Sequence, residues 1–220
     1  MDVLKWLEGE GWLVLASEPD DLSTIRGMAI TRISAEGGVA YIGMDTEDTE
    51  EIMEDMSELG APTGYLVDVA HEEDADIEEQ LKEASLVVIP GHFDIEELRT
   101  VLTGAAINGM KYAYERGAVI LAEGNAASLF GGVFVEDNRM IHGFEWVKDA
   151  YIVPYVTSIT QHPIAREILA ANVAKIAVGI GDDSALVLGP HSTVEIWGAR
   201  RVTLALNQHV VSEEDNDELQ

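Results

Sequence analysis

Hydrophobic and polar residues alternate in blocks along the first two thirds of the chain. Short apolar runs of the kind that form buried strands span residues 11–17, 37–44, 63–69, 85–91 and 118–122. Between them, apolar residues recur at helical spacing over residues 46–60, 74–84 and 94–117, with a break expected near Gly104. Strands that alternate with helices, several of them apolar throughout, predict a mainly parallel sheet sandwiched by helices.

The pattern changes after Gly132. Residues 134–144 predict a hairpin, residues 149–156 a strand and residues 163–175 a helix. Four short strands are expected to close the fold, over residues 175–183, 184–189, 192–198 and 200–207. No internal repeat or linker divides the chain, so we expect one α/β domain over residues 1–210 and an acidic tail over residues 211–220.

The composition narrows the possible partners. Asp and Glu number 41 against 13 Lys and Arg, so the net charge of the 220 residues is −28. Such a charge repels phosphate backbones and anionic lipids, which argues against nucleic acid and membrane partners. It would attract a cationic small molecule or peptide, although adaptation to high salt explains the same charge. An acidic start to the chain and the lack of a long apolar run predict a cytoplasmic protein.

One segment has the form of a catalytic turn. In GAVILAEGNAASLFGG, residues 117–132, a buried strand leads into a helix of small residues. Hydrolases that use a nucleophile elbow place a reactive Ser or Cys at such a turn. Here the turn carries Glu123, Gly124 and Asn125, and the chain has no cysteine.

Four segments, in order, carry a resemblance to a known family. They are AYIGMDTEDTEEIMEDMSELGA, ASLVVIPGHFDIEELRTVLTGAAI, RGAVILAEGNAAS and GIGDDSALVL. Together they resemble peptidase family S51, the cyanophycinase and aspartyl dipeptidase group. The resemblance implies a class I glutamine amidotransferase-like fold, a flavodoxin-like three-layer sandwich. It also implies hydrolysis of peptide bonds beside aspartate by a Ser nucleophile, a His base and an acidic partner.

Most of the catalytic positions implied by the resemblance carry the wrong residue types. The serine position falls on Gly124 and the histidine position on Val156, with Pro154 at the neighbouring aspartate position. The acidic position is retained as Asp182, beside Asp183. Glycine cannot attack a carbonyl and valine cannot accept a proton, so this route of acyl transfer is excluded.

Other residues could line a ligand crevice at the same place. Ligands of open parallel sheets bind beyond the carboxyl ends of the strands. The candidates are Gly91, His92, Glu123, Gly124, Asn125 and Asp182. Ser128, one helical turn past the elbow, is expected to lie on the helix surface or to bond to backbone, and His162 to cap a helix or to lie on the surface. No spacing in the sequence indicates a metal site or a cofactor.

Three functions remain open from the sequence. The first is a catalytically inactive S51-like protein that acts as a binding or scaffold module and forms a homo-oligomer. The second is a hydrolase with a relocated active site around Glu123 and His92. The third is a structural protein that assembles with itself. For self-association the sequence suggests a patch of small and aromatic residues on the helix that contains Met110, Tyr112 and Tyr114.

Overall fold

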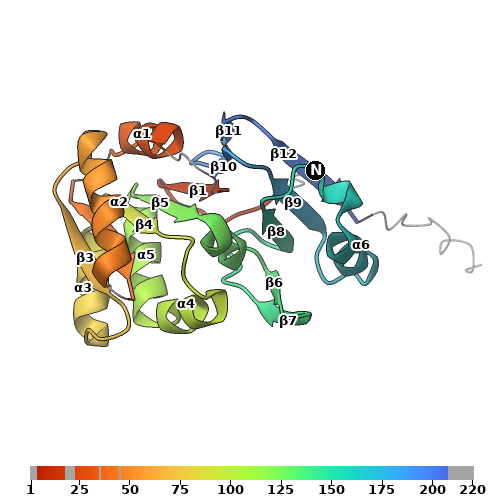
Figure 1. Ribbon diagram of the computed structural model, residues 1–220, viewed down its shortest axis with the longest axis horizontal. Coiled ribbons are helices and arrows are strands. Elements are labelled where there is room, and N and C mark those ends of the chain that lie inside the picture. Colours follow the sequence, from red (N-terminus) through yellow and green to blue (C-terminus); the bar gives the residue numbers. More distant parts are fainter. Residues whose placement is uncertain (1–3, 18–22, 35, 45, 208–220) are drawn as a thin grey trace, which may run out of the picture.

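The computed structural model describes residues 4–17, 23–34, 36–44 and 46–207, and only the backbone of residues 46–48. The predicted acidic tail lies outside the described residues. Figure 1 shows the chain as two sheets, with helices packed against them. No helix in the described part of the chain is long and apolar enough to cross a membrane.

The larger sheet has seven strands in the order β11-β10-β1-β5-β4-β2-β3. Its five parallel strands are β1 (Trp12–Ala16), β2 (Val39–Gly43), β3 (Gly64–Asp68), β4 (Leu86–Ile89) and β5 (Val119–Glu123). β10 (Ser184–Leu188) and β11 (Val194–Gly198) extend it as antiparallel strands beside β1. All five of the apolar runs that predicted strands in the first part of the chain lie in this sheet.

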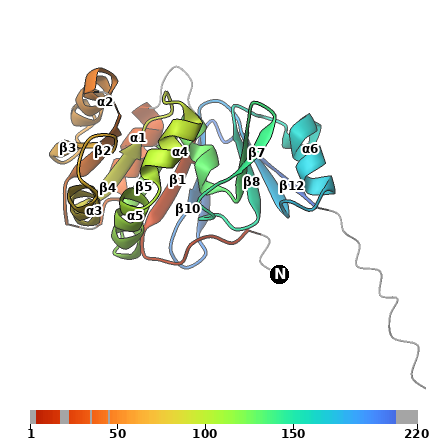
Figure 2. The ribbon, with the colours of Figure 1, turned by 90° about the horizontal axis from the view of Figure 1, so that it is seen from below.

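A second, five-stranded sheet has the order β12-β9-β8-β6-β7. Its strands are β6 (Val133–Glu136), β7 (Arg139–His142), β8 (Ala150–Pro154), β9 (Ile176–Ile180) and β12 (Val202–Leu206). β6 and β7 form the expected hairpin, and β8 and β9 pair in parallel. Figure 2 shows this sheet beside the larger one.

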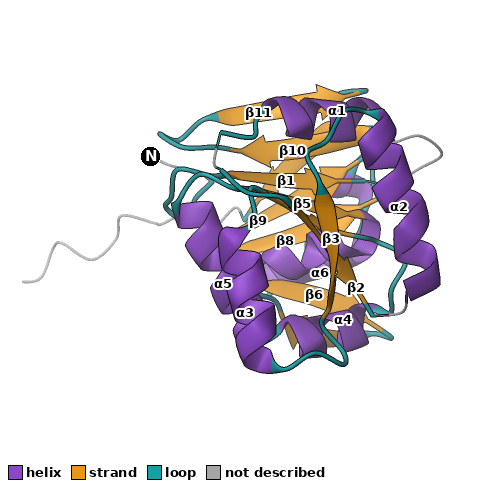
Figure 3. Cartoon of the chain, turned by 90° about the vertical axis from the view of Figure 1, so that its left-hand side faces the viewer, coloured by secondary structure: helices purple, strands orange, loops and turns teal. Residues whose placement is uncertain are grey.

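Helices cover both faces of the larger sheet, as Figure 3 shows end-on. On one face lie α1 (Ser23–Thr31) and α2 (Thr46–Glu58), and on the other α3 (Asp74–Glu83), α4 (Ile95–Leu102) and α5 (Ala105–Glu115). α6 (Pro163–Ala170) and the short 3₁₀ helix η2 (Ile159–Gln161) cover the outer face of the second sheet. The α/β fold class is therefore confirmed.

The break predicted near Gly104 separates α4 from α5. Gly104 has φ +97°, a backbone conformation that a residue with a Cβ adopts only at a cost. α4 ends at Leu102 and α5 begins at Ala105, so the chain changes direction between two helices that both face the sheet.

One helix was missed from the sequence, and one expectation about a surface was wrong. α1 was not predicted, because STIRGMAIT contains a glycine and several β-branched residues and its apolar face is narrow. The association patch on α5 was wrong. Met110 and Tyr114 are fully buried in the core under the helix, and Tyr112 alone of the three aromatic or sulfur side chains is exposed. Met110 and Tyr114 are therefore not available for self-association.

Candidate functional site

Parallel strands of the two sheets, β1 and β8, end close to each other at one side of the molecule. Ser17, which follows β1, donates its backbone N–H to the carbonyl oxygen of Ser184 over 2.9 Å. Its hydroxyl oxygen accepts the backbone N–H of Tyr155, which follows β8, over 3.0 Å. We call the loops that follow β1, β4, β5, β8 and β9 the carboxyl edge. This is the place where ligands bind in open parallel sheets.

The predicted elbow lies at the centre of the carboxyl edge. β5 ends at Glu123, and Gly124 turns the chain with φ +52° into η1 (Gly124–Phe130). The expected small-residue helix is thus present, as a 3₁₀ helix. Gly91 lies directly against this turn, since a Cβ on it would be 2.5 Å from the carbonyl oxygen of Glu123 and 2.7 Å from the Cα of Gly124. The structure therefore brings Gly91 and the elbow together.

Glu123 does not face an open crevice. Its side chain continues the row of Val119 and Leu121 toward α1, and the residue is 1% exposed. Arg26 on α1 donates from Nε to Oε1 over 2.9 Å and from Nη2 to Oε2 over 2.8 Å. A buried carboxylate held by two of the three nitrogens of a guanidinium is a structural ion pair, and both of its oxygens are engaged.

The same arginine also connects α2 to the elbow. Nη1 of Arg26 lies 2.9 Å from Oδ2 of Asp55 on α2, whose side chain is 61% exposed. Burial raises the pKa of the nearby Tyr41 to about 12, and the positive charge of Arg26 acts in the opposite direction. The guanidinium of Arg26 is thus the positive charge that interacts with Glu123, Asp55 and Tyr41 on this side of the elbow.

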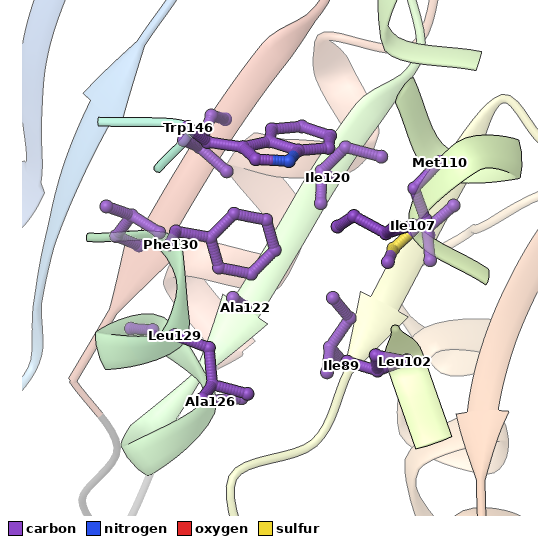
Figure 4. Close-up of a cluster of buried hydrophobic side chains, with 14 of the residues drawn as sticks. Ile89, Leu102, Ile107, Met110, Ile120, Ala122, Ala126, Leu129, Phe130 and Trp146 are labelled. Atoms are coloured by element: carbon purple, nitrogen blue, oxygen red, sulfur yellow. The ribbon is translucent and has the colours of Figure 1, made fainter. Parts of the chain in front are cut away.

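The hydroxyl group of η1, on Ser128, is bonded within the helix. Ser128 is buried and donates to the carbonyl oxygen of Asn125 over 2.7 Å, so of its two predicted roles the bond to backbone is confirmed and the place on the helix surface is wrong. Asn125 itself is exposed. Figure 4 shows how Ala126, Leu129 and Phe130 anchor η1 in the core, where Phe130 packs edge-on against Trp146 with ring centroids 5.2 Å apart.

Val156, at the position where the resemblance implies a histidine, belongs to another apolar cluster. Val156 packs against the apolar residues between the second sheet and α6. Pro154 is the last residue of β8, and Tyr155 after it has φ +62° and is 46% exposed. His162 caps α6 by accepting the N–H of Ala165 over 3.3 Å, which confirms the capping role among the two predicted for it.

The remaining candidates are exposed at the edge. Asp182 and Asp183 form the turn between β9 and β10, and Asp183 has φ +56°. His92 is exposed, with its ring centroid 4.1 Å from that of Phe93. Glu123 is separated from them by its burial against Arg26. Within the described residues, no three His, Asp or Glu side chains are grouped so as to hold a metal ion.

Three residues at this edge were missed by reasoning from the sequence. They are Ser17, Arg26 and Tyr155. Arg26 stands in an apolar stretch of a chain that is poor in basic residues, and this isolation is a signal that could have identified it as a buried partner for a carboxylate. Nothing in the sequence indicates the contact between Ser17 and Tyr155, because they are 138 residues apart.

Comparison with known proteins identifies the fold. No protein-family model and no curated protein sequence matches the chain. A solved structure of a peptidase from an acI-B1 Actinobacterium superposes with a TM-score of 0.69 at 16% identity, over 89% of this chain and 91% of the other. A crystal structure from Listeria monocytogenes EGD-e, described as a peptidase E protein, superposes with a TM-score of 0.61 at 13% identity. The match covers 86% of this chain and 98% of the other. The fold is therefore peptidase E-like.

Proposed function

We propose that the protein is a non-catalytic relative of the S51 peptidases, a cytoplasmic binding or scaffold module that works as a homo-oligomer. One observation carries the proposal. Gly124, at the elbow where the resemblance puts a nucleophile, has no side chain, and the neighbouring carboxylate of Glu123 is held by Arg26. Nucleophilic catalysis needs a nucleophile and a base within hydrogen-bond reach of each other.

The groups around the elbow support the same conclusion. Ser128 donates its hydroxyl proton to a backbone carbonyl, and Val156 packs under α6. A hydrolase whose active site had moved to Glu123 would need that carboxylate to be accessible. Its burial with Arg26 favours the non-catalytic proposal over the relocated site.

For the ligand of this module we propose a cationic small molecule or peptide. Asp182, Asp183 and Asn125 are exposed at the carboxyl edge, in a chain with a net charge of −28. Carboxylates and an amide can bind ammonium or guanidinium groups without any covalent step.

Activity measurements on the purified chain test the proposal. We expect no turnover of α-aspartyl or β-aspartyl dipeptides and no labelling by a serine-reactive fluorophosphonate probe. Turnover together with labelling of Ser128 or another hydroxyl would refute it and establish the relocated hydrolase.

Titration calorimetry with a β-aspartyl-arginine dipeptide tests the binding step. Asp182→Asn with Asp183→Asn should weaken binding about tenfold or more, which corresponds to about 1.4 kcal/mol. Asp137→Asn, in the turn between β6 and β7, is the matched control and should leave binding unchanged. Equal binding by all three proteins would remove the carboxyl edge as the cation site.

A further inference from the structure

β12 is an edge strand whose outer side has no partner within the described residues. Its sequence VTLAL contains no charge and no proline, the features with which proteins commonly protect exposed edges. Leu204 and Leu206 are 50% and 49% exposed. An uncharged, apolar edge of this kind is a template for pairing with another strand.

The hydrogen bonds of β12 show which backbone groups are open. Gly181 on the side of β9 donates to the carbonyl oxygen of Arg201 over 2.7 Å, and Asn207 donates to the carbonyl oxygen of Lys175 over 2.9 Å. Backbone groups alternate in direction along a strand, so the odd-numbered residues face β9. The N–H and C=O groups of Val202, Leu204 and Leu206 therefore point to the free edge.

An apolar groove accompanies this edge. It has a volume of about 740 Å³ and lies between β12 and α6, lined on the helix side by Ile159, Leu169 and Ala170. On the strand side the groove is lined by Leu204, Ala205 and Leu206 of β12. A strand added here would gain backbone hydrogen bonds together with apolar contacts along the groove.

The outermost strand of the larger sheet also exposes apolar side chains. Val194 and Ile196 on β11 are 49% and 38% exposed. Figure 1 shows β12 following β11 along the upper part of the molecule. The edge strands of both sheets therefore expose apolar residues.

We infer that this surface pairs two copies of the chain through antiparallel β12 strands, related by a twofold axis at Leu204. This register sets Leu204 opposite Leu204 and Val202 opposite Leu206 of the second copy, so every outward backbone group of the strand gains a partner. The two five-stranded sheets become one continuous sheet. The inference rests on the homo-oligomeric part of the proposed function and is independent of the loss of catalysis.

The charges that flank β12 in the sequence favour a second copy of the chain as the partner of this edge. Arg200 and Arg201, both exposed, directly precede β12, and the acidic residues 213–218 follow it along the chain. Antiparallel pairing sets Asn207, at the end of β12 in one copy, beside Arg201 of the other. The sequence before β12 is basic and the sequence after it is acidic, so two antiparallel copies have complementary charges on either side of the axis. The acidic helices α2 and α3 pack against the larger sheet and not against β12.

Light scattering during size exclusion tests the pairing. The full chain should have a dimeric mass in 0.5 M salt, where about 4 Å of Debye screening suppresses the repulsion between two acidic copies. Leu204→Asp should weaken the dimer about 100-fold or more, because it sets two unpaired carboxylates against each other across the axis. Leu59→Asp, at an exposed leucine after α2, is the matched control and should remain dimeric.

Cross-linking tests the twofold axis itself. The chain has no cysteine, so Leu204→Cys introduces a single thiol. A short thiol-specific cross-linker should join two Leu204→Cys chains and should not join two Leu59→Cys chains. A monomeric wild type at all salt concentrations, or a dimer that survives Leu204→Asp and is not cross-linked at position 204, would overturn the inference. Hydrolysis by the wild type would refute the non-catalytic proposal and leave this result unaffected.

Discussion

The elbow and the edge strand β12 differ in whether their polar groups have hydrogen-bond partners within the described chain. At the elbow, where the fold predicts chemistry, the carboxylate of Glu123 is buried on Arg26 and the hydroxyl of Ser128 is bonded to backbone. At β12, apolar side chains are exposed and the outward backbone groups have no described partner. The first region is closed by its own chain, and the second is left open.

This contrast is consistent with the proposal that the protein binds a partner and does not catalyse a reaction. Reactive sites keep strained or perturbed groups accessible to a substrate. Here the strained position is occupied by a glycine, and the charged group beside it stabilises the fold. An open, uncharged strand edge is instead a hazard unless it has a partner. The predictions below test how tightly the elbow is closed.

The largest effect is expected from breaking the buried ion pair. Arg26→Met leaves the carboxylate of Glu123 buried without a counter-charge, so the free energy of unfolding should fall by about 3–5 kcal/mol. Urea denaturation followed by circular dichroism measures it. Glu123→Leu combined with Arg26→Met removes both charges and should recover most of the loss.

Asp55→Asn is the matched control on the same arginine. Asp55 contacts Nη1 of Arg26 over 2.9 Å, but its side chain is 61% exposed. Exposed ion pairs contribute about 0–1 kcal/mol, so this change should be small. If Arg26→Met is no more destabilising than Asp55→Asn, the elbow is not closed by a buried pair and Glu123 is available to a ligand.

A second effect is expected where the loop after β4 touches the elbow. A Cβ on Gly91 would lie 2.5 Å from the carbonyl oxygen of Glu123, and backbone atoms cannot move aside cheaply. Gly91→Ala should therefore lower the free energy of unfolding by about 1–3 kcal/mol. At Gly132 the nearest atom to an added Cβ is 3.7 Å away, so Gly132→Ala should change stability little. Equal stability of the two variants in thermal denaturation would show that the loop is loose.

Much of the fold followed from the sequence because its signals are local. Runs such as Val119–Glu123 and the break at Gly104 depend on neighbours along the chain, and both were placed correctly. The division of the later strands into two sheets was not predictable in this way. β1 pairs with β10 across about the whole length of the domain, and short apolar strands do not encode their partners.

The site was predictable only in part, for the same reason. The turn at Gly124 and its contact with Gly91 follow from strand ends that meet at one edge. The accessibility of Glu123 was misjudged because its partner Arg26 is 97 residues away, on a helix that the pattern did not reveal. A carboxylate at a strand end has the same sequence signal whether it faces a ligand or a buried arginine.

The smallest effect is expected from introducing a hydroxyl at the elbow. Gly124→Ser places a Cβ at φ +52°, where a residue other than glycine costs about 1 kcal/mol, so the free energy of unfolding should fall by about that amount. No activity on aspartyl dipeptides should appear, since no base lies beside the new hydroxyl.

Adding Val156→His should not help, because the side chain at position 156 packs into the cluster under α6, away from the elbow. Denaturation and the dipeptide assay on the single and double variants measure both effects. Activity in the double variant with a bell-shaped pH profile would mean that the imidazole reaches position 124 and that only two side chains separate this protein from a peptidase.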